Sequence, residues 1–397
     1  MARLTSEKLA QAAALLADSE IDLWLTFVRE TSDGGDPVLP LILEGGLTWE
    51  SALMVSKTGR TVAVVGNYDA DPLKASGDWE EVVPYVQGIR DEFLNQLRAL
   101  DPLRIGINYS LDDSKADGLS HGMFLLLAKL LEGTPYAGRL VSSEPIVSRL
   151  RSVKTPAELA RIETAIRSTE RMFAEIGQFA RVGVTELEVY EQVHRTAREW
   201  GLGFSWDPAG DPIVNSGPDS MIGHGTPSAT IEISPGHVFH VDLGLAKDGY
   251  SSDIQRCWFV PGPAERGIPE DVGEALRAVN DAISAGAEVL KPGVEGWKVD
   301  QAAREALVSH GYEEYLHALG HQVGRVAHDG GSLLGPRWER YGDKPMVPVE
   351  AGQVYTLELG VTVPGRGYLG LEEMIVVEPN GVRWLTERQL EMPILQD

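Results

Sequence analysis

The sequence of 397 residues has little of three things, and each scarcity excludes a class of protein. A single cysteine, Cys257, cannot form a disulfide within the chain, and its apolar neighbours predict a buried thiol. No apolar run approaches the ~18 residues that a membrane-spanning helix needs. Basic residues number 35 against 59 acidic ones, and the net charge of -24 repels nucleic-acid phosphates and anionic lipid. We therefore expect no disulfide framework, no membrane span and no nucleic-acid partner.

The amino terminus also lacks the basic and then apolar layout of a secretory signal. Residues 1–20 instead place Leu9, Ala12, Ala13 and Leu16 on one face of an amphipathic helix. With no signal in the sequence, the expected location of the protein is the cytoplasm.

The clearest internal boundary lies near residue 155. There Thr155 offers a capping hydroxyl, Pro156 suits the first helical position and Glu158 completes a capping box, which predicts the start of a long helix. Before this point, short apolar runs alternate with helical stretches, a pattern typical of an α/β domain. The runs cover residues 21–28, 51–55, 61–65 and 104–107, and the helical stretches cover residues 89–100 and 122–132. We predict two domains, residues 1–154 and residues 155–397.

In the second domain one order of elements occurs twice, namely two helices followed by strands. The expected helices cover residues 156–177, 185–200, 270–290 and 297–310, and the expected strands lie within residues 237–260 and 350–377. The two halves therefore look like copies of one plan, which we hold as an interpretation because their residues are only weakly similar.

Acidic residues interrupt the strand-like runs of this domain, where a buried charge is costly unless something compensates it. Asp242, Asp253, Glu358 and Glu372 each lie in such a run, and His321 lies between the two pairs. An edge-strand charge explains any one of them. For the whole set, with a summed charge of about -4, two divalent cations are the better explanation, and the oxygen-rich donors favour Mn, Co, Fe or Zn. Adjacent strands would bring Asp242 and Asp253 to one face.

Several segments carry a family resemblance. These are HVDLGLAKDGYSSDIQR, GHQVGRVAHD, TLELG and LEEMIVVEPNG, preceded by LRSVKTPAELARI at the domain boundary. In this order they resemble the pita-bread metallopeptidases, the group of prolidases, Xaa-Pro aminopeptidases, methionine aminopeptidases and creatinase. The resemblance implies an α/β protein with a creatinase-type α/β amino-terminal domain and a pseudo-twofold α+β pita-bread catalytic domain. It also implies a homodimer.

The same resemblance implies roles for the five residues. Asp242 would bind one metal ion, and Asp253 and Glu372 would bridge two. His321 and Glu358 would complete the second site. The implied cofactors are two divalent metal ions per chain, Mn first, with Co, Zn or Fe as alternatives. Such a pair activates a water that attacks the peptide carbonyl, and Glu358 would carry its proton to the leaving nitrogen.

Two further histidines resemble family residues that line the substrate pocket. His224 matches the histidine that precedes the first aspartate, and His328 matches the second pocket histidine. The resemblance implies that both donate hydrogen bonds to the scissile carbonyl and the developing oxyanion. His317 also matches a family position, where support of the site is the expected role. We interpret three others as hydrogen-bonded structural residues: His237, His240 and His310.

The substrate pocket is less well defined by the sequence. A pocket for proline must be apolar and closely fitted, and Trp206, Tyr250 and Trp338 are candidates for its walls, with core packing as the alternative for each. The chain departs from the family pattern at residues 358–360, where Glu-Leu-Gly replaces Glu-Pro-Gly, and at Gly370, where an arginine is common. The candidates left to bind a substrate carboxylate are Arg325, Arg337 and Arg366.

These observations predict a dinuclear metal-dependent peptidase that cleaves Xaa-Pro bonds in small proline-containing peptides. The amino-terminal domain disfavours a methionine aminopeptidase, and the chain length favours a dipeptidase (prolidase) over an Xaa-Pro aminopeptidase that acts on longer peptides. Two other readings stay open. One is a non-peptidase hydrolase or lyase, because fold does not fix function, and the other is a catalytically silent module that binds a protein partner.

Overall fold

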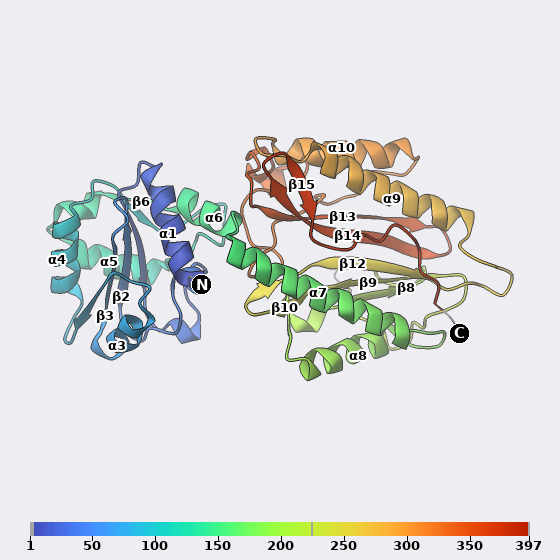
Figure 1. Cartoon of the computed structure of the whole chain (residues 1–397), viewed down its shortest axis with the longest axis horizontal. Helices are drawn as coiled ribbons and strands as arrows, with labels where there is room; N and C mark the ends of the chain where they lie inside the picture. Colours follow the sequence, from blue (N-terminus) through green and yellow to red (C-terminus); the bar gives the residue numbers. More distant parts are fainter. Residues whose placement is uncertain (1–3, 224, 396–397) are drawn as a thin grey trace. The chain divides into compact units, whose positions relative to one another are not determined.

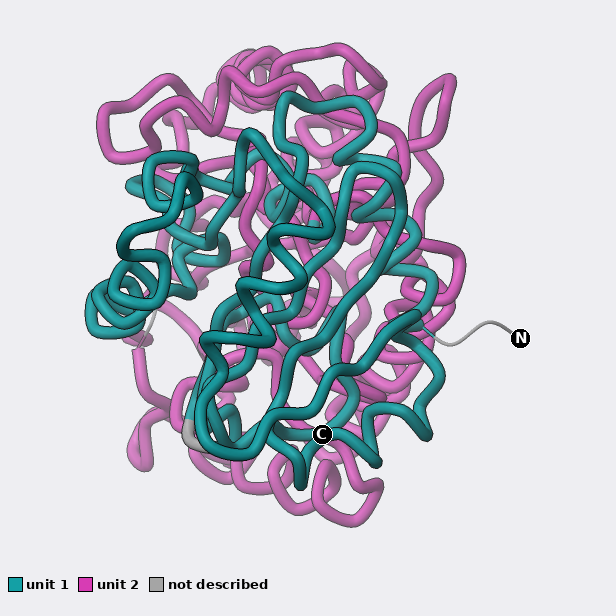
Figure 2. Tube along the Cα trace, turned by 90° about the vertical axis from the view of Figure 1, so that its left-hand side faces the viewer, with its two compact units in different colours: residues 1–151 teal, residues 152–397 magenta. Residues whose placement is uncertain are grey.

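The computed structural model describes residues 4–223 and 225–395 (Figure 1), and contacts within the chain divide it into two compact units. The first unit comprises residues 1–151 and the second residues 152–397, drawn in teal and magenta in Figure 2. The division falls just before the capping box at Thr155. Among the helices that the structure describes, none is both long enough and apolar enough to cross a membrane.

A mixed sheet of six strands forms the centre of the first unit, in the order β4-β3-β2-β1-β5-β6. The strands are β1 (Leu23–Val28), β2 (Ser51–Ser56), β3 (Thr61–Gly66), β4 (Glu81–Tyr85), β5 (Ile105–Ile107) and β6 (Leu140–Ser142). β1 pairs antiparallel with β2 and parallel with β5. Side chains of β1 alternate, so that Trp24 and Val28 pack in one core and Leu25 and Phe27 in another. The sheet therefore has an apolar core on each face.

Helices supply the other half of each core. The helices of the first unit are α1 (Leu4–Ala17), α2 (Leu39–Ile42), α3 (Asn67–Ser76), α4 (Arg90–Leu100), α5 (His121–Leu131) and α6 (Glu144–Ser152), with 3-10 turns at Thr31–Asp33 and Pro135–Gly138. α1 buries Leu9, Ala12 and Leu16, as its amphipathic pattern predicts. The sequence patterns did not indicate α3, which contains Pro72, or β4, which contains Pro84 and is mostly half-exposed. A proline usually indicates the end of a helix or strand, so the sequence pattern predicts a break at both positions.

Two helix pairs belong to the second unit. They are α7 (Pro156–Phe179) with α8 (Glu186–Glu199), and α9 (Glu270–Val289) with α10 (Gly296–Ser309). Both predicted capping boxes are present: Thr155 accepts a hydrogen bond from the Glu158 amide at 3.3 Å, and Thr185 accepts one from the Glu188 amide at 3.2 Å. Each glutamate in turn accepts a hydrogen bond from the amide of its capping threonine at 2.8 Å. The boxes fix where α7 and α8 begin.

The main sheet of the second unit is antiparallel and has the order β13-β14-β12-β9-β8, with β15 paired to β14. Its strands are β8 (Ile213–Ser216), β9 (Val238–Leu243), β12 (Ile254–Phe259), β13 (Val354–Val363), β14 (Gly367–Glu378) and β15 (Gly381–Trp384). A smaller sheet contains β7 (Gly203–Phe204), β10 (Leu245–Lys247) and β11 (Tyr250–Ser251). Short 3-10 turns lie at Pro208–Gly210, Glu339–Tyr341 and Lys344–Met346.

The helix pairs cover this sheet in two places (Figure 1). α7 packs on β10, β11 and β12, α8 packs on β8, and α9 packs on β13, β14 and β15. Leu357, Leu359 and Leu371 pack in one core with residues of α9 and α10. Because strand side chains alternate, Glu358 and Glu372 point to the other face of the sheet. The predicted repetition of a helix pair and strands is thus present, and it leaves one face of the sheet for polar groups.

Candidate metal centre

One row across the main sheet carries four polar side chains. Asp242 of β9 pairs with Gln255 of β12, and Gln255 pairs with Glu372 of β14. Glu372 in turn pairs with Glu358 of β13. Directly opposite residues of antiparallel strands point to the same face, with Cβ atoms about 4.5–5.5 Å apart. The register therefore brings three of the four predicted carboxylates into one line, with a glutamine between Asp242 and Glu372.

The other two predicted residues join this row. Asp253 lies two positions before Gln255, and its Oδ2 is 3.6 Å from Nε2 of His321. The same nitrogen is 3.4 Å from Oε1 of Glu358. One ligand atom from each of Asp253, His321 and Glu372 lies within 4.8 Å of the other two. Residues from four distant parts of the sequence thus converge on one small volume.

The imidazole of His321 is oriented by the chain around it. Its Nδ1 is 3.1 Å from the carbonyl oxygen of Ala327, so Nδ1 carries the proton and Nε2 presents its lone pair to the carboxylates. Burial, and then the neighbouring His328, lower the pKa of His321 to about 3. The ring is therefore neutral at physiological pH, as a metal-ligating histidine must be.

Burial has the opposite effect on the carboxyl groups. It raises the pKa of Asp242 to about 7, and burial followed by the charge of Asp242 raises the pKa of Glu358 to about 8. The pKa values of Asp253 and Glu372 are also raised, first by burial and then by the neighbouring carboxylates. Four carboxyl groups in one buried place cannot all ionise cheaply unless positive charge is supplied.

The donor atoms fit divalent cations. Two buried oxygens, Oδ1 of Asp242 and Oε1 of Glu372, have no hydrogen-bond partner among the described residues. An orphaned buried oxygen costs free energy, whereas the same oxygen facing a cation is satisfied. Oxygen donors with a single imidazole suit Mn, Co, Fe or Zn. The residues present therefore fit a site for divalent cations.

Comparison with known proteins gives the family. The sequence model of metallopeptidase family M24 matches residues 160–379, which contain all five predicted ligands. The chain belongs to this family. It is 30% identical to the uncharacterized peptidase YqhT of Bacillus subtilis over 257 residues, which cover 64% of this chain and 68% of that protein. It is 29% identical to the Xaa-Pro dipeptidase of Pyrococcus furiosus over 250 residues, or 63% and 67% of the two chains.

Solved structures extend the similarity to both units of the M24 peptidase. An Xaa-Pro dipeptidase from Bacillus anthracis has a TM-score of 0.75 at 24% identity and covers 98% of this chain and 100% of its own. An X-Pro aminopeptidase from Thermotoga maritima has a TM-score of 0.69 at 25% identity and covers 98% and 99%. The predicted family and two-part pita-bread fold are confirmed, and the chain is a metallopeptidase of family M24. The comparisons do not separate a dipeptidase from an aminopeptidase.

The raised pKa values predict how the metal-free peptidase responds to pH. Between pH 6.5 and pH 8, carboxyl groups of the unfolded chain are ionised, whereas Asp242 (pKa about 7) and Glu358 (pKa about 8) still bind protons in the folded chain. The folded state then binds more protons than the unfolded state, so stability falls as the pH rises. Below pH 6.5, the lowered pKa of His321 acts in the opposite direction. We expect the melting temperature of chelated protein to fall by at least about 2 °C across this window.

Thermal unfolding after chelation, at several pH values from 6.5 to 8, checks this expectation. Saturating Mn should remove the fall, because a bound cation stabilises the ionised carboxylates. Asp242→Asn should make it shallower, because one of the proton-binding groups is gone. A melting temperature of the chelated protein that stays constant or rises over the window would contradict the electrostatic account of the site.

Of the two predicted pocket histidines, only His328 lies among the described residues. His328 is exposed, and its ring centroid lies 4.2 Å from that of His321, edge to face. His224 lies outside the described residues. On either side of it in the sequence, the amides of Ser216 and Ser228 donate hydrogen bonds to Glu186 of α8, each at 2.9 Å. His328 therefore lies beside the centre, and its role, like that of His224, stays a prediction.

The predicted pocket walls are arranged in different ways. Trp206 packs its ring against Gly244, two residues after Asp242, and its indole N–H donates to the Gly210 carbonyl at 2.8 Å. Tyr250 is fully buried, and its hydroxyl donates to Glu158 at 3.0 Å. Trp206 thus packs at the end of β9, the strand that carries Asp242, whereas Tyr250 has the core packing that was the alternative for it. Trp338 stacks on Tyr341 beside Arg304 and Arg340.

The arginine candidates for a substrate carboxylate have other partners. Arg366, at the turn between β13 and β14, forms ion pairs with Glu265 at 2.8 Å and Asp271 at 2.6 Å. It lies at the far end of the hairpin from the Glu358 pair, since Val363 pairs with Gly367 five positions further along. The guanidinium of Arg325 lies over Tyr250, and that of Arg337 over Trp297. In these contacts, none of the three guanidinium groups is paired with a carboxylate of the row.

Three further residues, which the sequence did not indicate as part of the site, lie beside the carboxylates: Gln255, His240 and Asp211. Gln255 is in the row, and His240, interpreted as structural, contacts Gln255 and Asn215, each at 3.0 Å. Asp211 is buried near Asp242. Burial, and then the charge of Asp242, raise the pKa of Asp211. His240 precedes Asp242 by two positions and Gln255 follows Asp253 by two. The two-residue spacing of strands was the signal that would have found them.

Proposed function

We propose that this M24 peptidase hydrolyses the Xaa-Pro bond of dipeptides with the help of two divalent cations. Asp242, Asp253, His321, Glu358 and Glu372 would hold the cations. The observation that carries the proposal is the convergence of four carboxylates and one neutral imidazole on a volume where two buried oxygens have no hydrogen-bond partner among the described residues. The Xaa-Pro dipeptidases among the similar proteins support the choice of substrate.

The exposure of the side chains indicates which of them would bind the cations and which would transfer a proton. Bound cations would supply Lewis acidity, which polarises the peptide carbonyl and lowers the pKa of water. Asp253 and Glu372 are buried, whereas the side chain of Glu358 is 21% exposed. Glu358 lies at the end of the row and has a raised pKa, so it is the group best placed to take a proton and pass it to the leaving nitrogen. His328, exposed beside His321, would donate a hydrogen bond to the substrate.

The remaining parts of the proposal concern the metal, the substrate pocket and the assembly. Mn is the proposed metal, with Co, Zn or Fe as alternatives, because the site has oxygen and nitrogen donors and no thiolate. Trp206 and His224 would complete the pocket for small proline-containing peptides. The protein would act as a homodimer in the cytoplasm.

A peptide panel tests the substrate. Leu-Pro, Leu-Pro-Pro and Leu-Leu are assayed with metal-free enzyme reconstituted with Mn, Co, Zn or Fe. We expect kcat/KM for Leu-Pro to exceed that for the other two by at least ~10-fold, because a pocket shaped for a carboxy-terminal proline discriminates by that much.

The same panel separates the alternatives. Cleavage of Leu-Pro-Pro without cleavage of Leu-Pro would identify an Xaa-Pro aminopeptidase, the activity named for the Thermotoga maritima structure. No turnover of either proline peptide, in protein shown by elemental analysis to carry two metal ions per chain, would remove the proline assignment and favour another reaction on the same fold.

A further inference from the structure

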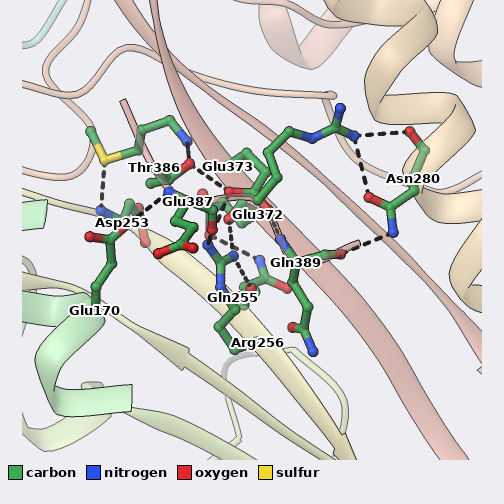
Figure 3. Close-up of polar contacts among 12 residues, drawn as sticks. Glu170, Asp253, Gln255, Arg256, Asn280, Glu372, Glu373, Thr386, Glu387 and Gln389 are labelled. Carbon is green, nitrogen blue, oxygen red and sulfur yellow. Dashed lines mark hydrogen bonds and ion pairs between the residues drawn. The ribbon is translucent and has the colours of Figure 1, made fainter. Parts of the chain in front are cut away.

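Gln255 lies at the centre of the row and is 6% exposed. Its side-chain nitrogen is 3.1 Å from Oε2 of Glu358 and 3.1 Å from Oε2 of Glu372 (the latter contact is drawn in Figure 3). An amide nitrogen has two hydrogens, so one group donates to both glutamates and uses its full capacity. The side-chain oxygen of Gln255 lies 3.0 Å from Nε2 of His240.

These contacts fix the orientation of the amide. When both glutamates are ionised, as cation binding requires, their oxygens can only accept, so the nitrogen end of Gln255 faces them and its oxygen end faces His240. His240 is itself buried, and its Nε2 contacts the side-chain oxygen of Gln255 on the side away from the glutamates. The contact needs the space at Gly370, because a Cβ at that position would lie 2.7 Å from the oxygen of Gln255 and 3.1 Å from Nε2 of His240.

The hydrogen bonds select one oxygen of each glutamate and leave the other oxygen for a different partner. Oε1 of Glu358 is 3.4 Å from Nε2 of His321, among the predicted metal ligands. Oε1 of Glu372 is buried and without a hydrogen-bond partner among the described residues. By holding both Oε2 atoms, Gln255 limits the rotation of the two carboxylates and turns their remaining oxygens toward the site.

We propose that Gln255, held by His240, is a positioning residue that orients Glu358 and Glu372 to bind divalent cations. This inference rests on the proposed function, because it needs the cations to bind between these side chains. Groups that hydrogen-bond to metal ligands typically contribute 10–100-fold to metal affinity. Here one neutral amide serves two ligands at once, and it does so without adding charge to a cluster that is already acidic.

The test is Gln255→Met, which keeps the length of the side chain and removes its donors. Calorimetric titration of the metal-free protein with Mn should show dissociation constants ~10–100-fold weaker than in the unchanged protein. Gln389→Met is the matched control, since Gln389 is also buried but its side-chain amide forms hydrogen bonds with the backbone of Cys257 rather than with a carboxylate. The control should bind Mn like the unchanged protein.

A second variant covers the case in which Gln255→Met does not fold. His240→Leu removes the partner of the amide oxygen and should weaken Mn binding in the same direction. If Gln255→Met or His240→Leu folds and binds Mn as tightly as the unchanged protein, the positioning role is overturned. A merely structural role would lower the melting temperature of the metal-free variant and leave its Mn dissociation constants unchanged. If the unchanged protein itself binds no Mn, Co, Zn or Fe, the proposed function fails instead.

Discussion

Replacing Asp253 by asparagine is expected to abolish peptidase activity and cation binding together. Asp253 contributes an oxygen that lies within 4.8 Å of the ligand atoms of both His321 and Glu372, so its charge acts at the middle of the centre. Asparagine has nearly the same shape but no negative charge. Loss of several kcal/mol of Lewis-acid stabilisation of the transition state corresponds to a rate at least ~1000-fold lower.

Folding should not limit this variant. Burial raises the pKa of Asp253, which means that the ionised group destabilises the metal-free fold. A neutral amide should therefore leave the melting temperature of the chelated protein at pH 8 unchanged or raise it. Elemental analysis and peptidase assays measure the loss. Asp248→Asn is the matched control, because Asp248 is exposed in the turn between β10 and β11, five residues before Asp253, and has a positive φ of 51°, which asparagine tolerates. An Asp253→Asn enzyme with an undiminished rate would refute the assignment of the centre.

Local signals predicted the helices of the second unit closely. The capping boxes at Thr155 and Thr185 determine where two helices begin, because they satisfy amides that have no partner within the helix. The sequence did not predict the register of the sheet. Glu358 and Glu372 come together through ten paired positions of β13 and β14, from Val354 with Val376 to Val363 with Gly367. Their spacing in the sequence carries no information about that alignment.

The site illustrates the same difference. The five predicted ligands are recognisable because charged residues inside apolar strands are costly and because their segments resemble a family. Gln255 and His240 are neutral at physiological pH and occur in strands that also carry ordinary polar residues, so their types do not mark them, and their two-residue spacing from Asp253 and Asp242 is the one local signal. Only the cross-strand pairing shows that Gln255 faces both Asp242 and Glu372. Likewise, Tyr250 and Arg366 are plausible pocket residues until their contacts with Glu158 and with two other carboxylates are known.

Removing either member of the buried ion pair between Arg256 and Glu373 should strongly destabilise the second unit. Arg256 follows Gln255 and Glu373 follows Glu372, so the pair lies on the opposite face of the sheet from the row. Nη2 of Arg256 is 3.0 Å from Oε2 of Glu373 (Figure 3). The two side chains are only 10% and 0% exposed. Glu373→Ala would leave a buried guanidinium without its counter-charge, which costs about 3–5 kcal/mol.

The same pair connects stability to the proposed metal centre. Arg256 also donates to the carbonyl oxygens of Gln255 at 2.8 Å and Glu372 at 3.0 Å, the two residues whose side chains meet in the row. Glu373→Ala should therefore weaken Mn binding as well as lower the free energy of unfolding. The double variant Arg256→Met/Glu373→Leu removes both charges. Its free energy of unfolding, measured with denaturant, should therefore be close to that of the unchanged protein. Because it still lacks the contacts to the two carbonyls, its Mn binding should stay weakened. Single variants within ~1 kcal/mol of the unchanged protein would show that the pair does not hold β12 to β14.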